Sequence, residues 1–111
     1  MSTILVTGAS GFLGKVITRE LLLQKYQVLT LGRQSTNDIV HDLSIGPPII
    51  NLKDLDFVIH AAGRAHSIPK TKAEEQLFLD INLAGTNNLL NSLETLVRSP
   101  KCFVFISSVS V

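Results

Sequence analysis

Three glycines spaced three residues apart, Gly8, Gly11 and Gly14, constrain the fold of this chain more than any other feature. They follow an apolar run at residues 3–6 that predicts a buried strand, and they precede residues 15–23, where apolar side chains recur at helical spacing. A strand, a tight turn and a helix form a phosphate site, because the helix start offers unpaired N–H groups and a positive dipole end. Gly8 allows the sharp turn, Gly11 lets a pyrophosphate approach the backbone, and Gly14 lets the helix pack closely on the strand.

Strand and helix patterns alternate along the rest of the chain. We predict strands at residues 26–31, 39–41, 56–63 and 101–106, a brief helical turn at 52–55 and a long helix at 72–98. Such alternation predicts an α/β fold with a parallel, doubly wound, Rossmann-type sheet and helices on both faces. Right-handed crossovers then favour the strand order 3-2-1-4-5, and ligands of such sheets bind outside the carboxyl ends of the strands.

Composition limits the possible classes of protein. The 111 residues are 45% hydrophobic and 17% charged, enough for one globular domain with a core but not for two. The net charge of +1 gives no reason to expect a nucleic acid or an anionic membrane as partner. Neither a membrane-spanning run nor a secretion signal is recognisable, so we expect a cytoplasmic protein. The single Cys102 begins an apolar run and is predicted to be a small core residue.

Candidate contacts for an adenosine moiety follow the second and third predicted strands. The second strand ends in Gly32-Arg33 and carries no acid. A guanidinium can stack on adenine and pair with a 2′-phosphate, whereas a carboxylate there would bind the ribose hydroxyls, so Arg33 favours NADP over NAD. A solvated loop charge is the alternative. Asp42 could accept from the adenine amino group while Leu43 covers the ring, and a turn cap is an equally ordinary use of this carboxylate.

Small and polar residues mark the fourth strand and the long helix. The strand ends in Ala61, Ala62 and Gly63, whose size would let the nicotinamide half of a cofactor cross the sheet edge closely. His60 precedes them and is predicted to be a satisfied structural histidine. Asn82 and Gly85 interrupt the long helix at a cost in propensity, which calls for a polar or packing reason.

The Thr-Gly-x-x-Gly-x-x-Gly pattern at residues 7–14 resembles the fingerprint of the extended short-chain dehydrogenase/reductases, the NAD-dependent epimerase/dehydratase family. Residues 60–63 and 82–86 are similar to its Asn/His-x-Ala-Ala/Gly and Asn-x-x-Gly-Thr segments. The resemblance implies cofactor contacts from Thr7, Gly8, Gly11, Phe12, Leu13, Gly14, Arg33, Asp42, Leu43, Ala61, Ala62, Gly63, Asn82 and Ser107, and no metal. It also implies that Ser108, after the fifth strand, is the catalytic hydroxyl, although a serine pair there also suits turn chemistry.

The chain departs from the family pattern in its catalytic pair. The family uses Tyr-x-x-x-Lys, but the only tyrosine is Tyr26, with Thr30 four residues later. The resemblance covers nearly all of this chain, and the chain covers only about the first third of such an enzyme. We therefore expect residues 1–111 to be an incomplete NAD(P)-binding domain without the substrate domain, and expect this fragment to be inactive.

For the parent protein, the resemblance implies a nucleotide-diphosphate-sugar epimerase, dehydratase or reductase of polysaccharide biosynthesis, an isomerase or oxidoreductase with a nucleotide-sugar substrate. Two alternatives stay open. One is a non-catalytic NAD(P)-sensing module, and the other is an NADPH-dependent reductase of a non-sugar alcohol or ketone. The fifth strand is predicted to be an exposed apolar edge, which favours a homodimer or a self-associating fragment.

Overall fold

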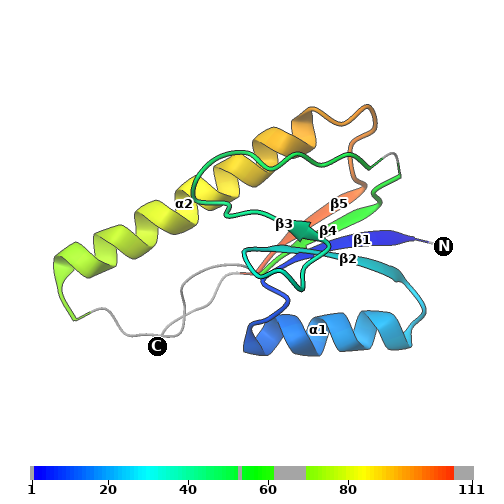
Figure 1. Cartoon of the computed structure of the whole chain (residues 1–111), viewed down its shortest axis with the longest axis horizontal. Coiled ribbons are helices and arrows are strands. Elements are labelled where there is room, and N and C mark those ends of the chain that lie inside the picture. The colour runs from blue at the N-terminus through cyan, green and yellow to red at the C-terminus, as the bar shows by residue number, and fades with distance from the viewer. Residues whose placement is uncertain (1, 53, 62–69, 107–111) are drawn as a thin grey trace.

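The computed structural model describes residues 2–52, 54–61 and 70–106 of the chain. The elements in order are β1 Thr3–Thr7, α1 Phe12–Leu23, β2 Gln27–Gly32, β3 Ile39–Val40, β4 Phe57–His60, α2 Lys72–Glu94 and β5 Cys102–Phe105. The five strands form one parallel sheet in the order β3-β2-β1-β4-β5, which confirms the predicted topology. Figure 1 shows α1 and α2 on opposite faces of this sheet.

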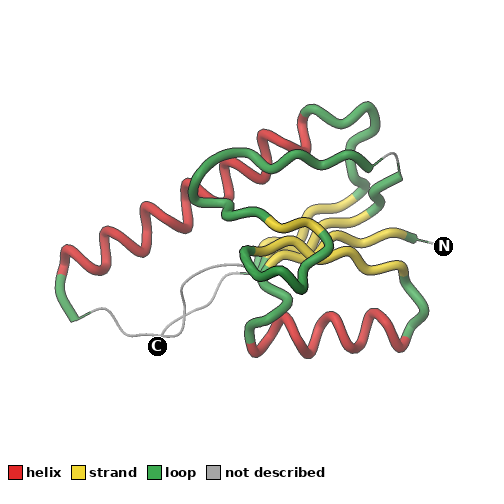
Figure 2. The backbone as a smooth tube through the Cα atoms, in the orientation of Figure 1, coloured by secondary structure: helices red, strands yellow, loops and turns green. Residues whose placement is uncertain are grey.

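The register brings the carboxyl ends of the strands to one edge. Thr7, the last residue of β1, lies opposite Leu31 of β2 and His60 of β4. His60 in turn lies opposite Phe105 of β5. In Figure 2 the described loops that follow β1 and β2 leave the sheet from this same side. This edge is where a parallel α/β sheet binds its ligands.

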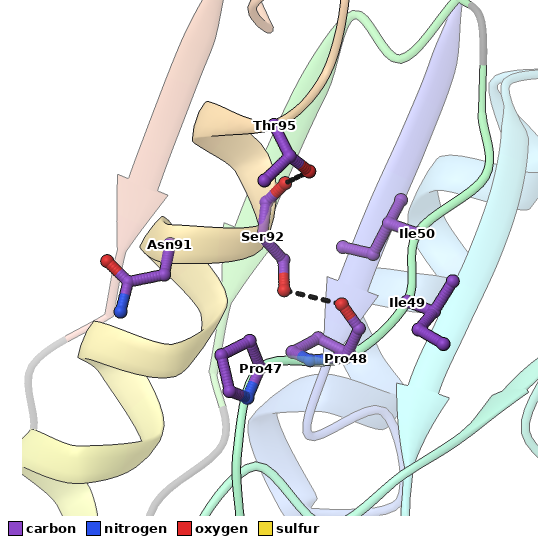
Figure 3. Close-up of a pocket in the computed structure, with 7 residues that line it drawn as sticks. All are labelled: Pro47, Pro48, Ile49, Ile50, Asn91, Ser92 and Thr95. Atoms are coloured by element: carbon purple, nitrogen blue, oxygen red, sulfur yellow. Dashed lines mark hydrogen bonds between the residues drawn. The ribbon is translucent and has the colours of Figure 1, made fainter.

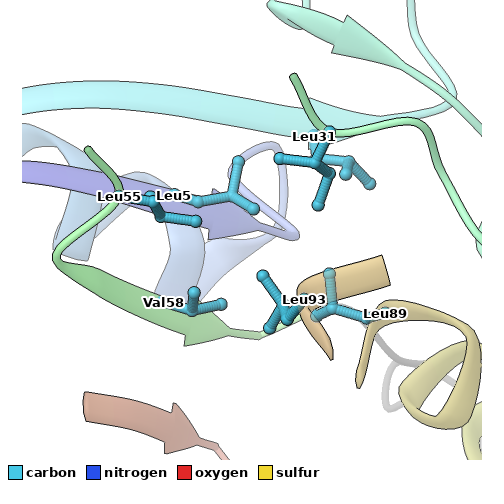
Figure 4. Packing of buried hydrophobic residues seen from close by; sticks show 7 residues of the cluster. Leu5, Leu31, Leu55, Val58, Leu89 and Leu93 are labelled. Atoms are coloured by element: carbon cyan, nitrogen blue, oxygen red, sulfur yellow. The ribbon is translucent and has the colours of Figure 1, made fainter. Parts of the chain in front are cut away.

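The core lies between the sheet and α2. Leucine and valine side chains of β1, β2 and β4 meet two leucines of α2 (Figure 4), in a cluster of Leu5, Leu31, Ile50, Leu55, Val58, Leu89 and Leu93. Burying each such side chain contributes about 1.5–3 kcal/mol, so this layer holds α2 in place over the sheet. The position of the helix fixes where its polar residues meet the strand ends.

The helix α2 begins and ends with local hydrogen bonds. The Thr71 hydroxyl accepts from the backbone N–H of Glu74 at 3.1 Å, and the Glu74 carboxylate accepts from the Lys70 N–H at 2.8 Å. Thr71 is thus the N-cap, and the Glu74 carboxylate reaches back one residue beyond it, to Lys70, rather than to the N-cap N–H as in a standard capping box. The helix ends at Glu94, four residues before the predicted end, because the Thr95 N–H bonds three residues back and tightens the last turn.

Two further predictions from the sequence were wrong. No described residue of 52–55 is helical, because Leu55 enters the core and the neighbouring Asp56 exchanges strand-like backbone bonds with Thr3 and Lys101. Cys102 is exposed and is not a core residue. Side chains alternate along β5 and Phe103 faces the core, so Cys102 points to the other face of an edge strand.

The predicted apolar edge is confirmed. β5 is the last strand of the sheet, and Val104 and Phe105 are 43% and 53% exposed. Within the described residues, no helix is both long and apolar enough to cross a bilayer.

A pocket of about 380 Å³ lies between the 47–50 loop and the end of α2 (Figure 3), lined by Pro47, Pro48, Ile49, Ile50, Asn91, Ser92 and Thr95. Its polar groups bond to one another: the Ser92 hydroxyl donates to the Pro48 carbonyl at 2.5 Å, and the Thr95 hydroxyl donates to the Ser92 carbonyl at 2.6 Å. The first bond ties the loop to the helix, and the second lies within the end of α2. None of the lining residues belongs to the predicted site.

Candidate functional site

The glycine turn connects β1 directly to α1. Gly8 has a φ of 74°, in the left-handed region where a side chain would be strained, as the predicted sharp turn requires. The Gly11 N–H donates to the Gly8 carbonyl at 3.1 Å and closes the turn. The helix then begins at Phe12, three residues earlier than its apolar pattern indicated, and Gly11 at its N-cap supplies no side-chain cap. The first-turn N–H groups are therefore not engaged by their own N-cap side chain, as an anion site needs.

Gly14 is required by the packing of this turn. A Cβ at Gly14 would lie 1.8 Å from the Gly8 carbonyl oxygen and 2.9 Å from the Ala9 Cα. The predicted close approach is confirmed, and its partner is the backbone of the turn that follows the strand. Gly8 and Gly14 therefore form one unit, because the first bends the chain and the second makes room for the bend.

The side chains around Gly14 on α1 lie mostly outside the core. Phe12 is 81% exposed and Leu13 46%, so their role in the predicted site rests on their backbone. Farther along, Ile17 is half-buried whereas Val16 and Leu23 are exposed. The apolar helical pattern is thus only partly buried, because α1 covers β1 and β2 with one narrow face.

His60 links three elements at the strand ends. It is buried, as is Thr7, and its Nδ1 lies 2.6 Å from the Thr7 hydroxyl while its Nε2 lies 3.0 Å from the Thr86 hydroxyl on α2. Its ring also packs against Phe103 and Phe105, with centroid distances of 6.1 and 5.6 Å. Burial lowers the pKa of His60 below its ordinary 6.5, so the ring is neutral at pH 7. The prediction of a satisfied structural histidine is confirmed.

The predicted adenosine contacts lie in the loops after β2 and β3. Arg33 is exposed directly after Gly32. Asp42 accepts from the Ser44 N–H at 2.9 Å and from the Ser44 hydroxyl at 2.7 Å, an Asx turn. These two hydrogen bonds lower the pKa of Asp42, and the positive charge of Arg33 contributes in the same direction. The turn-cap alternative for Asp42 is therefore observed, and its contact with adenine stays a prediction.

Leu43 is held in position by α2. The Asn88 side-chain amide donates to the Leu43 carbonyl at 2.6 Å, and a Cβ on Gly85 would lie 3.5 Å from the Leu43 Cβ. Sequence reasoning missed Asn88. Its signal was a further asparagine in the helix interior, three residues after Gly85 and thus on the same face.

Asn82 lies half-buried on α2, one turn before Thr86, whose hydroxyl donates to the Asn82 carbonyl at 2.9 Å. Ala61 donates its N–H to the Thr7 carbonyl at 3.1 Å, which keeps it beside the end of β1. The other predicted contacts, Ala62, Gly63, Ser107 and Ser108, lie outside the described residues. Among the residues that the structure does describe, no group of three or more His, Cys, Asp or Glu could hold a metal ion.

The sheet thus places a glycine turn at β1, a small residue after β4 and the loops after β2 and β3 along one edge. This arrangement can hold an elongated anionic ligand across the centre of the sheet. Residues 4–111 match the sequence profile of the NAD dependent epimerase/dehydratase family. The chain belongs to this family.

Individual relatives show the breadth of the epimerase/dehydratase family. The chain is 32% identical to a decarboxylating sterol-4-alpha-carboxylate 3-dehydrogenase of Dictyostelium discoideum, over 100% of this chain and 37% of that protein. It is 33% identical to a UDP-glucose 4-epimerase of Vibrio cholerae, over 98% of this chain and 35% of that protein. The chain therefore spans little more than a third of the length of these curated relatives.

A solved structure supports the fold. The crystal structure of Gre2 from Candida albicans in complex with NADPH superposes with a TM-score of 0.78 at 23% identity. The match covers 97% of this chain and 37% of that one. The likeness shows the fold, which in this chain is a five-stranded parallel sheet in the order β3-β2-β1-β4-β5.

Proposed function

We propose that this chain binds NADP or NAD along the carboxyl edge of its sheet, as the NAD(P)-binding part of a nucleotide-sugar epimerase, dehydratase or reductase. The observation that carries the proposal is the tight turn that Gly8 and Gly14 make possible between β1 and α1, called the cradle below. Gly8 turns with a φ of 74°, and the space that a Cβ on Gly14 would fill is occupied by the turn itself. A pyrophosphate could then rest on the N–H groups at the start of α1, where the helix dipole is positive.

The remaining predicted residues take the other parts of the dinucleotide. Thr7, Gly11, Phe12 and Leu13 complete the pyrophosphate turn, and Asp42 and Leu43 meet the adenine. Ala61, Ala62 and Gly63 leave room for the nicotinamide, with Asn82 and Ser107 beside it. The bound cofactor would supply hydride transfer, and the protein would bind and orient it. In the full-length protein Ser108 would hydrogen-bond a substrate oxygen.

We favour NADP because Gly32-Arg33 offers a guanidinium and no carboxylate where the ribose would lie. The charge of Arg33 acts on Asp42, which indicates that both predicted adenosine contacts belong to one neighbourhood. The family description names NAD, and the Gre2 structure contains NADPH, so the choice has to be made from this chain's own residues.

Calorimetric titration with NADPH and NADH tests the proposal. Arg33→Ala should weaken NADPH binding about tenfold and leave NADH binding within about twofold, since one charge-assisted contact to the 2′-phosphate is lost. Arg98→Ala is the matched control, because it removes the same charge from a residue that pairs with Asp54 and Asp56, at the opposite end of β4. Equal losses for both cofactors would remove the preference for NADP, and binding of neither by the native chain would refute the function.

A second candidate is an NADPH-dependent reductase of a non-sugar alcohol or ketone. The same arginine favours it, and so does the similarity to a sterol dehydrogenase. The 111 residues contain no Tyr-x-x-x-Lys pair, so we expect no turnover from this chain alone with either substrate class. Assays of the full-length protein with nucleotide sugars and with sterol ketones separate the two candidates.

A further inference from the structure

The hydrogen bonds at His60 run in a single direction. The Thr86 hydroxyl has one proton and donates it to the Asn82 carbonyl at 2.9 Å. It must therefore accept from the His60 Nε2, which lies 3.0 Å away. A neutral imidazole protonated on Nε2 has a lone pair on Nδ1, so the Thr7 hydroxyl donates to Nδ1 across 2.6 Å. The bond from His60 to Thr86 and the bond from Thr7 to His60 therefore point in the same direction along the series.

The hydrogen-bonded series of Thr7, His60 and Thr86, called the relay below, connects the strands to α2, which backbone pairing does not do. The ladder already ties Thr7 to His60 along β1 and β4. It does not tie either strand to α2, which crosses above the sheet in Figure 1. The bond from His60 to Thr86 makes that connection one helical turn from Asn82. Thr7 and His60 are both almost fully buried, where a hydrogen bond is stronger than in water and a missing partner is costly.

We propose that His60 is a positioning residue for the glycine turn, acting through Thr7, and this inference rests on the proposed dinucleotide function. Thr7 is the last residue of β1 and the next residue, Gly8, must leave the strand at a φ of 74°. The Gly8 carbonyl also packs against Gly14 with no space to spare. The hydroxyl bond to His60 holds the side chain of Thr7, and with it the point where the turn begins. Without that bond the turn is less ordered before the dinucleotide binds. Part of the binding free energy is then used to order the turn, so the affinity for the dinucleotide falls.

Two substitutions separate the halves of the relay. His60→Asn places a carbonyl oxygen where Nδ1 stood, so it keeps the bond from Thr7 and gives up the bond to Thr86. His60→Gln places an N–H where Nε2 stood, so it keeps Thr86 and gives up Thr7. Each variant loses one hydrogen bond of His60, the part-buried bond to Thr86 in His60→Asn and the buried bond to Thr7 in His60→Gln, and urea unfolding measures the stability that each retains. Their affinities for NADPH and NADH, measured by calorimetry, should differ.

The expected result is that His60→Asn binds within about twofold of the native chain and His60→Gln binds about tenfold more weakly. Thr86→Val removes the same bond as His60→Asn from the other side and should also leave affinity nearly unchanged, which keeps the test valid if one histidine variant does not fold. Nitrogen NMR of labelled histidine, assigned by the loss of one signal in His60→Asn, should show the proton of His60 on Nε2.

Affinity losses that are equal in the two histidine variants, or that follow stability alone, would overturn the positioning role and leave the dinucleotide function intact. A proton on Nδ1 would overturn the direction of the relay. A native chain that binds neither cofactor would refute the function and the positioning role together, so the two failures are distinguishable.

Discussion

Alanine substitution at Gly14 and at Gly85 should change stability in opposite directions, although both glycines lie within helices. At Gly85 the new Cβ would lie 3.5 Å from the Leu43 Cβ, an ordinary contact, and no nearer described atom opposes it. Alanine is the better helix former by about 1 kcal/mol, so Gly85→Ala should be stabilising by up to that amount. At Gly14 the same methyl would lie 1.8 Å from the Gly8 carbonyl oxygen.

That oxygen would have to move by more than an ångström, in a turn that Gly8 already holds at positive φ. Overpacking of this kind costs about 1–3 kcal/mol, occasionally more, and the gain in helix propensity is smaller. Gly14→Ala should therefore lower the free energy of unfolding by about 2 kcal/mol and weaken dinucleotide binding through the displaced turn. Urea unfolding followed by circular dichroism measures both variants.

Gly46→Ala is the control for both glycine substitutions. Its Cβ would meet nothing within 4 Å among the described residues, so we expect a change within about 0.5 kcal/mol. If Gly14→Ala proved as stable as Gly85→Ala, the argument that the turn leaves no space at residue 14 would fail. The cradle on which the cofactor proposal rests would then lose its support.

Four further predictions follow from the packing and the charges. Stability should fall as the pH is lowered from 7.5 to 5, about the span over which a histidine titrates. The reason is that His60 has a folded pKa below 6.5, so the unfolded chain takes up the proton first. In urea unfolding, His60→Asn should make stability less dependent on pH over this span. Asn88→Ala should cost about 1 kcal/mol in the same assay, since it frees a loop carbonyl, whereas the exposed neighbour Asn87→Ala should cost almost nothing. Asp42 has a folded pKa below 3.8, so its contribution is present above that pH and lost as the pH falls through the folded value, and acid unfolding of Asp42→Asn should be less steep. Val104→Lys on the edge strand should reduce self-association in sedimentation experiments, and an unchanged sedimentation profile, or a native chain that stays monomeric, would contradict that role of β5.

Much of the fold could be predicted because its signals are local. An apolar run before Gly8 and helical spacing after Gly14 identify β1 and α1, and strand–helix alternation with a handedness rule leaves few topologies. Errors arose where a neighbour in space decides the outcome. Cys102 is exposed because Phe103 takes the inward position on β5, and no property of residue 102 itself reveals that choice. Residues 52–55 are extended because Asp56 pairs with a strand distant in sequence.

The sequence by itself determined the glycine turn, the class of sheet, and the absence of a Tyr-x-x-x-Lys pair within these 111 residues, since each depends on residue type and spacing along the chain. Only the tertiary structure decided that Asn88 holds the Leu43 carbonyl and that His60 bonds Thr7 and Thr86. Those partners are 26 to 53 residues apart in the sequence. The direction of a buried hydrogen bond depends on which acceptor each neighbouring donor group already bonds. Those pairings are known only when the strands and the helix have been packed together.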